Sequence, residues 1–300
     1  EWIVWLPGLV TGINVACRTA GSDGDSVVTA VPVYPPFLSA PGMARRELIT
    51  VPLREDDSGW HWDLERFEAS LTPRTRLLLL CSPHNPVGRA FRRAELMDLI
   101  DICERHDVII CSDEIHADLI LDPARRHIPT ASINPAAHER CITLMAPSKT
   151  FNIPGLGCSF AVIGNDRLRS RFRQAMAGIV PDVNVLGYTA AEAAYRDGWD
   201  WHRALVDYLR QNRDLVFLEI SRMPALQTTP SRGDLPGVDR CPWPEHKKSD
   251  RFFRIGRGWS FGWQRFWCGR FFASEFWLPS GSAGGCPGPH ARGVNQPVVG

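Results

Sequence analysis

One lysine stands in a polar segment between two apolar runs. Lys149 lies within Ala146-Pro-Ser-Lys-Thr-Phe-Asn-Ile-Pro-Gly155, between the runs Cys141–Met145 and Ser159–Ile163. Short apolar runs of this kind are typical of buried strands, and a lysine held between two of them is poorly placed for solvation. Burial lowers the pKa of a lysine and makes its amine a nucleophile toward carbonyl groups. An ordinary surface-loop lysine would give the same local pattern, so this segment alone leaves both interpretations open.

Three other polar signals also follow strand-like runs. Gly8, Asn85 and Asp113 each come after an apolar stretch, as Lys149 does. Ligands of open α/β sheets bind outside the carboxyl ends of the strands, so we expect these four residues to meet at one edge of a sheet. Each also has a structural interpretation on its own: Gly8 as an ordinary strand–helix turn, Asn85 as a turn former, and Asp113 as a helix N-cap. Their joint occurrence favours a binding site.

Strand-like and helix-like segments alternate along the chain. Thr75–Cys81 is a continuous apolar run, typical of a strand buried on both faces of a parallel sheet. Arg92–His106 has apolar residues at helical spacing, and Asp107–Cys111 then completes a βαβ unit. We therefore predict an α/β fold, with a mostly parallel sheet and helices on both faces. Further strands are predicted at 1–5, 25–34, 47–53, 141–145 and 159–163, and further helices from residue 11 and at 37–43, 63–70, 165–178, 186–195 and 201–222.

The bulk composition excludes several classes of protein. With 34 Lys and Arg against 33 Asp and Glu, the formal net charge of +1 gives no reason to expect nucleic acid or an anionic membrane as a partner. No apolar run approaches the ~20 residues of a membrane span. The nine cysteines include no CxxC pair, so we expect neither a metal site nor a disulfide framework. The chain begins without a positively charged leader, and a cytoplasmic location is expected.

Four motifs together resemble one enzyme class. They are Tyr34-Pro-Pro-Phe37, Asn85-Pro-Val-Gly88, Ser112-Asp-Glu-Ile-His116 and Ser148-Lys-Thr-Phe-Asn-Ile-Pro-Gly-Leu156. In these motifs and their spacing, residues 1 to about 230 resemble the fold-type I pyridoxal-phosphate enzymes, and more narrowly the MalY/PatB-type cystathionine β-lyases. The resemblance implies the large domain of that fold at 1–200, without its N-terminal arm. It also implies the start of an incomplete small domain at 201–230.

The resemblance also implies a role for each motif. Lys149 would form a Schiff base with pyridoxal 5'-phosphate. Asp113 would pair with the protonated ring nitrogen, because a cationic ring is the better electron sink. Gly157 stands where aminotransferases usually have a phosphate-binding arginine, and lyases of this subfamily also lack that arginine. The other implied contacts to the cofactor are Asn85 at the ring hydroxyl, Tyr34 stacked on the ring, His116 near the ring oxygen, and Ser148 with the backbone N–H groups of Gly8, Leu9 and Val10 at the phosphate.

The implied reaction is β-elimination from a sulfur-containing amino acid. Cystathionine or a related cysteine S-conjugate would give a thiol, pyruvate and ammonia, with Lys149 as the general base at Cα. An aminotransferase shares every step through proton abstraction, so motifs of the cofactor site do not separate the two reactions. A catalytically inactive fragment of such an enzyme is the third interpretation. The resemblance further implies a homodimer.

The last seventy residues depart from this pattern. Residues 231–300 contain 12 of the 25 glycines and 5 of the 11 tryptophans, but only 7 Leu, Ile or Val. With so few aliphatic side chains the segment could hardly bury a core, so we expect an aberrant and disordered tail that is translated out of frame. Its interleaved Arg, Trp and Phe would also suit a surface for stacking nucleic-acid bases, which is the weaker interpretation. In the family, an arginine near the end of the chain binds the substrate carboxylate, and no such residue can be named here.

Overall fold

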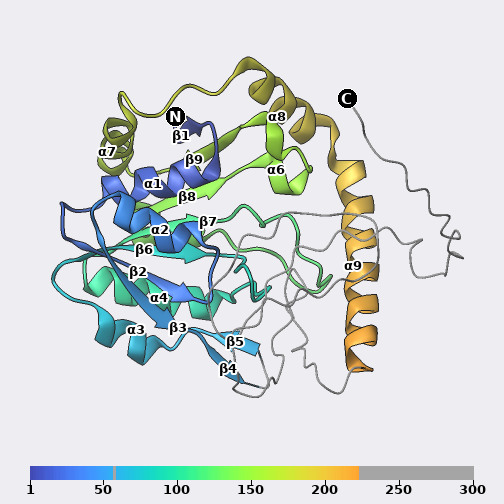
Figure 1. Cartoon of the computed structure of the whole chain (residues 1–300), viewed down its shortest axis with the longest axis horizontal. Coiled ribbons are helices and arrows are strands. Elements are labelled where there is room, and N and C mark those ends of the chain that lie inside the picture. Colours follow the sequence, from blue (N-terminus) through green and yellow to red (C-terminus); the bar gives the residue numbers. More distant parts are fainter. Residues whose placement is uncertain (57–58, 223–300) are drawn as a thin grey trace, which may run out of the picture.

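A seven-stranded sheet forms the centre of the protein (Figure 1). The computed structural model describes residues 1–56 and 59–222 of the 300. The strands lie in the spatial order β1-β9-β8-β7-β6-β2-β3. Their bounds are β1 Ile3–Leu6, β2 Ser26–Val31, β3 Glu47–Pro52, β6 Thr75–Cys81, β7 Ile109–Asp113, β8 Cys141–Met145 and β9 Ser159–Val162.

The directions of the strands bring most of their carboxyl ends to one edge. Strands β3, β2, β6, β7 and β8 run parallel to one another. Strand β9 is antiparallel to both of its neighbours, β8 and β1, so β1 points the same way as β8. The carboxyl ends of β1, β8, β7, β6 and β2 therefore lie along the same edge, where ligands bind in sheets of this type.

Both faces of the sheet are buried because its strands are apolar on both sides. In β6, Leu77 and Leu79 belong to one core cluster, whereas Leu78 and Leu80 belong to the other. This alternation follows from the two-residue period of a strand. Helices α1 (Leu9–Thr19), α2 (Pro36–Met43) and α7 (Asp166–Met176) cover the first face, and α3 (Leu64–Ser70), α4 (Arg93–Arg105) and α5 (Pro135–Arg140) cover the second.

The remaining elements extend from this three-layered core. Strands β4 (Arg54–Asp56) and β5 (Gly59–His61) form a separate two-stranded sheet. Helix α6 (Pro147–Thr150) follows β8, and α8 (Val185–Asp197) leads into the long helix α9 (Trp199–Ser221). Figure 1 shows α9 standing beside the sheet. Two short 3₁₀ helices complete the described elements, η1 at Thr130–Ser132 and η2 at Pro154–Leu156.

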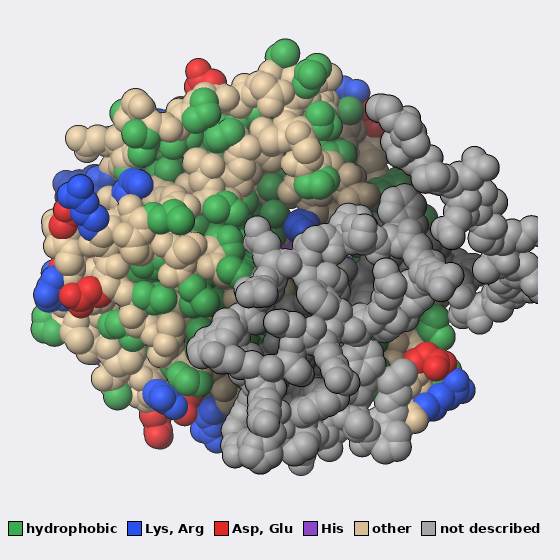
Figure 2. Space-filling view, viewed as in Figure 1, with side chains coloured by type: hydrophobic (Ala, Val, Ile, Leu, Met, Phe, Trp, Pro, Cys, Tyr) green, Lys and Arg blue, Asp and Glu red, His purple; other side chains and the backbone are tan. Residues whose placement is uncertain are grey.

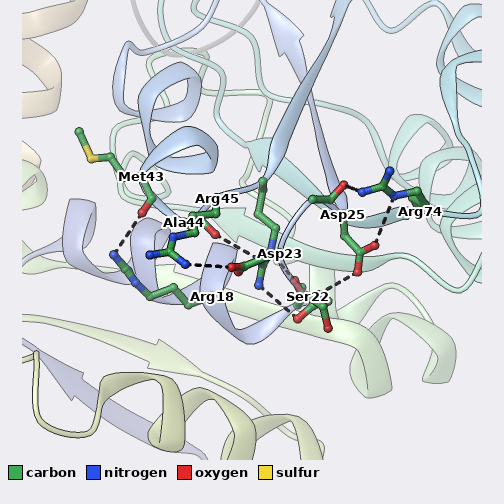
Figure 3. Close-up of polar contacts among 12 residues, drawn as sticks. Arg18, Ser22, Asp23, Asp25, Met43, Ala44, Arg45 and Arg74 are labelled. Carbon is green, nitrogen blue, oxygen red and sulfur yellow. Dashed lines mark hydrogen bonds and ion pairs between the residues drawn. The ribbon is translucent and has the colours of Figure 1, made fainter.

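A cluster of charged side chains holds the opposite edge of the sheet, where β2 begins (Figure 3). Asp23 accepts hydrogen bonds from Arg45 at 3.2 Å and from Arg46 at 3.1 Å. Asp25 accepts a hydrogen bond from the backbone N–H of Ser22 at 2.8 Å and lies 3.9 Å from the Arg74 guanidinium. These contacts fasten the loop between α1 and β2. They lie at the amino end of the strand, so we interpret them as structural.

The predicted elements are confirmed within a few residues, as is the mostly parallel sheet with helices on both faces. Lys149 differs from expectation in its local setting, because Pro147 starts a single helical turn where the sequence suggested a loop. Helix α9 begins at Trp199 and spans the predicted domain boundary at residue 200, and that boundary stays a prediction. The prediction for 231–300, of a disordered tail translated out of frame, lies outside the described residues.

Candidate active site

The predicted site residues follow strand ends along one edge of the sheet. Gly8 follows β1, Lys149 follows β8, Asp113 ends β7, Asn85 follows β6 and Tyr34 follows β2. The order of the strands sets the same order for these residues, with only β9 inserted between the first two. The sequence prediction that these segments converge is therefore supported by the topology. Their roles toward a cofactor stay predictions.

Lys149 lies on the one-turn helix α6, directly beyond the carboxyl end of β8. The turn is closed by the N–H of Phe151, which donates to the carbonyl of Pro147 at 2.9 Å. Lys149 is half-buried. The sequence adds a fact that the motif alone does not reveal: Lys149 is the only lysine before Lys247. Within the described residues it is therefore the only side-chain amine that could react with a carbonyl group.

Asp113 is a buried carboxyl group whose proton affinity is unusually high. Burial raises its pKa from 3.8 to about 7, against the lowering effect of a hydrogen bond from the N–H of Ile115. The neighbouring Glu114 carboxylate raises this pKa further, and the positive charge of Lys149 lowers it. Asp113 and Lys149 thus interact electrostatically across the adjacent ends of β7 and β8. A cation placed against Asp113 would stabilise its ionised form.

A buried histidine and a thiol hold the segment that carries Asn85. The N–H of Asn85 donates to Cys81 Sγ at 3.3 Å, and its carbonyl accepts from the N–H of Tyr34 at 3.1 Å. His84 Nε2 donates to the carbonyl of Pro32 at 2.8 Å. Burial lowers the pKa of His84 to about 4, so its ring is neutral. These bonds join the loop after β6 to the loop after β2. No pattern in the sequence predicts this connection.

Glu114 anchors the end of β7 from the other side. Its carboxylate is fully buried and lies 2.6 Å from His127 Nε2. It also accepts bonds from the Ser112 hydroxyl at 2.8 Å and from the N–H of Thr130 at 2.9 Å. A buried carboxylate is tolerated only when it is bonded in this way, so the network fixes the backbone next to Asp113. In the sequence Glu114 stands out only as part of a motif, and its hydrogen-bond network is not predicted.

The residues predicted to bind phosphate lie at the amino end of α1. Gly8 is the N-cap of α1, and no side-chain hydrogen bond caps the helix there. The first N–H groups of a helix and its positive dipole end attract anions. Gly8 itself has φ −178°, an extended conformation that any residue adopts, and an added Cβ would meet only Thr11 Oγ1 at 3.9 Å. The conformation at position 8 therefore does not require glycine. The predicted role rests on the backbone N–H groups of Gly8, Leu9 and Val10.

Gly157 packs against the backbone next to this loop. It has φ +54°, the left-handed region that favours glycine. A Cβ at this position would lie 3.1 Å from the carbonyl oxygen of Pro7, which precedes Gly8. Any side chain here would be strained and would press on the predicted phosphate loop. The backbone at Gly157 therefore packs closely against the backbone that leads into Gly8.

The last two predicted residues also lie at this edge. His116 is buried in the turn after β7, where its carbonyl accepts a hydrogen bond from the N–H of Leu119 at 2.9 Å. Ser148 is half-buried on α6, and its carbonyl accepts from the N–H of Ile153 at 3.0 Å. The structure thus brings both residues to the candidate site. The roles of the His116 and Ser148 side chains toward a cofactor stay predictions.

Other kinds of site find no support in the described part of the chain. Within 1–56 and 59–222, no group of three or more His, Cys, Asp or Glu side chains could hold a metal ion. No helix in these ranges is both long and apolar enough to cross a membrane. Figure 2 shows charged side chains of both signs interspersed on the described part of the face it presents. The edge of the sheet around Lys149 and Asp113 is therefore the candidate active site.

Comparison with known proteins decides the family. The sequence profile of "Aminotransferase class I and II" matches residues 1–236. The chain belongs to this family. One curated relative is "Cystathionine beta-lyase PatB" of Bacillus subtilis (strain 168). It is 38% identical over 218 residues, which cover 71% of this chain and 55% of the relative. The chain thus spans about half the length of the curated relatives it matches.

Solved structures agree with this membership of the aminotransferase class I and II family. One is described as "Crystal Structure of OvoB", with a TM-score of 0.77 and 47% identity, covering 79% of this chain and 64% of that chain. Another is cystalysin from Treponema denticola, described as containing a pyridoxal 5'-phosphate cofactor. Its TM-score is 0.74 at 34% identity, covering 78% of this chain and 60% of that chain. The fold-type I architecture expected from the motifs is therefore confirmed.

Proposed function

We propose that the chain carries the active site of a pyridoxal-phosphate-dependent carbon–sulfur β-lyase. The observation that carries the proposal is the pairing of Lys149 and Asp113 at adjacent strand ends. Their charges interact, and Asp113 is held in a setting that favours a cationic partner. Relatives such as PatB, named as cystathionine β-lyases, support the reaction class.

The donor set fits pyridoxal phosphate. A buried carboxyl group with its pKa raised to about 7 is stabilised in its ionised form by a cation, and a protonated pyridine nitrogen is such a cation. When bound, the cofactor supplies an electron sink for charge that develops at the substrate Cα. The residues proposed to hold it are Lys149, Asp113, Asn85, Tyr34, His116, Ser148, Gly8, Leu9 and Val10.

The protein's own groups would then perform three tasks. Lys149 would hold the cofactor through Nζ and would act as the base that accepts the proton from the substrate Cα. Asp113 would hold the protonated ring nitrogen. The backbone around Gly8 would bind the phosphate and so orient the ring. After the thiol leaves from Cβ, the released aminoacrylate would tautomerise and be hydrolysed by water to pyruvate and ammonia.

The substrate and assembly are part of the same proposal. We infer a sulfur-containing amino acid, cystathionine or a related cysteine S-conjugate, as the substrate. We further infer a homodimer in the cytoplasm, without nucleic acid or membrane as a partner. The family name itself favours an aminotransferase as the second candidate, because that reaction uses the same lysine and carboxylate. A cofactor-binding but inactive fragment is the third candidate.

The first prediction is that pyridoxal phosphate becomes attached to Lys149. The full 300-residue chain is incubated with the cofactor, reduced with borohydride and digested, and the modified lysine is located by mass spectrometry. We expect label on the peptide containing Lys149, and loss of that label in Lys149→Ala. The Lys247→Ala/Lys248→Ala variant is the matched control, because it removes the other two lysines of the chain and should keep the label.

Product analysis then separates the candidate reactions. Pyruvate formed from cystathionine without any keto-acid acceptor supports the lyase. Turnover that requires a keto acid, with no pyruvate in its absence, would support the aminotransferase instead. Label at Lys149 without turnover of either kind would identify an inactive fragment. Absence of label from Lys149 would overturn the proposed cofactor site.

A further inference from the structure

A single carboxylate connects the helix that carries Lys149 to the turn that follows Asp113. The hydroxyl of Thr150 donates to Asp118 Oδ2 at 3.0 Å. Thr150 is adjacent to Lys149 in sequence and is only 1% exposed. Asp118 follows Asp113 by five residues. The bond therefore spans the two segments that leave the neighbouring strands β8 and β7, close to both groups of the proposed reaction.

Helix α9 holds the segment of Asp118 from behind. His202 Nε2 donates to the backbone carbonyl of Asp118 at 2.7 Å. Farther along α9, Arg210 and Arg213 donate to the carbonyl of Leu121 at 2.8 and 3.2 Å. Apolar packing reinforces these bonds and makes the segment a rigid support for the Asp118 side chain. The packed residues are Leu119 and Leu121 with Leu205, Val206 and Leu209.

An aromatic cluster packs against the residue that follows Thr150, at the same carboxyl end of α6. The ring of Phe151, next to Thr150, lies 5.4 Å from that of Tyr195 and 5.2 Å from that of Trp199, both edge-to-face. Burial raises the pKa of the Tyr195 hydroxyl, and the negative charge of Asp118 raises it further. Asp118 thus lies within electrostatic reach of this cluster. Apolar packing at Phe151 and the polar bond at Thr150 together hold the carboxyl end of α6.

We propose that Asp118 is a positioning residue that sets the orientation of Lys149 through the Thr150 hydroxyl. A helix of four residues has almost no stability of its own, so bonds from outside must determine its orientation. The Thr150–Asp118 bond ties the residue next to Lys149 to the segment that follows β7, and a bond to an ionised acceptor is stronger than one between neutral groups. The inference rests on the proposed function, because Lys149 needs a defined orientation only if it must reach a carbonyl carbon.

Substitutions at Thr150 test the proposal in the full-length chain. Thr150→Val keeps the shape of the side chain and removes its donor, whereas Thr150→Ser keeps the donor. We expect Thr150→Val to slow attachment of pyridoxal phosphate to Lys149 by about tenfold, which corresponds to the loss of one bond to a charged group. Thr150→Ser should restore most of that rate. Asp118→Leu should act like Thr150→Val, and the double variant should lose little more than either single variant.

Pyridoxine 5'-phosphate distinguishes positioning from a general structural role. This analogue lacks the aldehyde, so its Kd reports the ring and phosphate contacts without Lys149. The proposal expects its Kd to be unchanged in Thr150→Val, whereas a disrupted site would weaken it together with the attachment rate. Thr189→Val is the matched control, because it removes a hydroxyl that donates to the Val185 carbonyl at 2.9 Å within α8. Attachment should proceed at the wild-type rate in this control.

Each outcome decides one of the two inferences. Wild-type attachment rates in Thr150→Val would overturn the positioning role while leaving the proposed function intact. Failure of the wild-type chain to take up cofactor at Lys149 would overturn the proposed function. In that case amide hydrogen exchange over residues 147–151 still decides the structural premise. Faster exchange in Thr150→Val than in Thr189→Val supports a bond that orders α6, and equal exchange overturns it.

Discussion

At the scale of single residues, the charge on Asp113 is the most informative feature of the site. A carboxyl group at the end of a buried strand loses its hydration, and Glu114 beside it adds a like charge. Lys149 compensates only in part. In the cofactor-free site, ionisation of Asp113 therefore costs free energy. A binding site that stabilises its ligand often carries such a destabilised group, because the ligand supplies the missing charge.

This cost leads to a prediction about stability and pH. Burial raises the pKa of Asp113 from 3.8 to about 7, so between these pH values the folded chain binds more protons than the unfolded chain. The free energy of unfolding of the cofactor-free protein then falls as the pH rises, by roughly 4 kcal/mol at most. We expect Asp113→Asn to unfold at higher urea concentration than wild type at pH 8, with a difference that shrinks toward pH 5.

An exposed aspartate provides the control for this experiment. Asp98 lies on the outer surface of α4, and Asp98→Asn should change the urea midpoint by a similar small amount at every pH. A difference between Asp113→Asn and wild type that stays constant from pH 5 to pH 8 would contradict the raised pKa. The outcome bears on the reaction, because the same carboxyl group is proposed to keep the ring nitrogen protonated.

The proposed site residues can be recognised in the sequence, but the residues that support them cannot. Lys149 and Asp113 are recognisable because their types, placed after apolar runs, suit one chemistry. Asp118 and Glu114 depend on partners far along the chain, Thr150 and Thr130, which no local pattern links to them. Long-range hydrogen bonds require the folded backbone before they can be recognised.

At the scale of elements, the sequence predicts which segments form strands of the sheet, but it does not predict the direction of every strand. The run at Ser159–Val162 is apolar like the parallel strands before it, and nothing in such a run records which way the strand points. The structure shows β9 antiparallel to β8 and β1. This reversal returns β1 to the common direction and so brings Gly8 to the edge that carries Lys149. The position of Gly8 at this edge thus depends on the directions of β9 and β1, which the hydrophobic pattern of the sequence does not reveal.

The contact between α8 and the segment after Lys149 gives a prediction at this scale. A Cβ added to Gly187 would lie 2.5 Å from the carbonyl oxygen of Leu156 and 3.1 Å from that of Gly157. Both carbonyls belong to rigid backbone, so Gly187→Ala must push α8 away. We expect the free energy of unfolding to fall by about 1–3 kcal/mol, and attachment of pyridoxal phosphate to Lys149 to slow.

The matched control for this substitution is Gly42→Ala. Gly42 also lies in a helix, α2, and nothing lies within 4 Å of an added Cβ there. Alanine is favoured over glycine in a helix by about 0.5–1 kcal/mol, so this variant should be as stable as wild type or slightly more stable. Equal urea midpoints for the two variants would contradict a close approach between α8 and the backbone at 156–157.

At the scale of the whole molecule, the site is assembled from most of the sheet. Its proposed residues follow β1, β2, β6, β7 and β8, which span residues 3–145 and include both the first and the second halves of the described fold. A ligand bound there would contact segments that follow five strands of the sheet. Binding should therefore stabilise the fold as a whole, rather than one loop of it.

Addition of the cofactor should therefore raise the stability of the folded chain. A ligand that binds only the folded state at a hundred times its Kd raises the free energy of unfolding by about 2.7 kcal/mol. We expect pyridoxal phosphate to raise the thermal unfolding midpoint of the wild-type chain in a concentration-dependent way. The rise should be smaller in Lys149→Ala, which loses the covalent bond, and unchanged in Lys247→Ala/Lys248→Ala. An equal rise in all three proteins would show binding that does not involve Lys149. No rise at any concentration would contradict a site that connects the carboxyl ends of five strands.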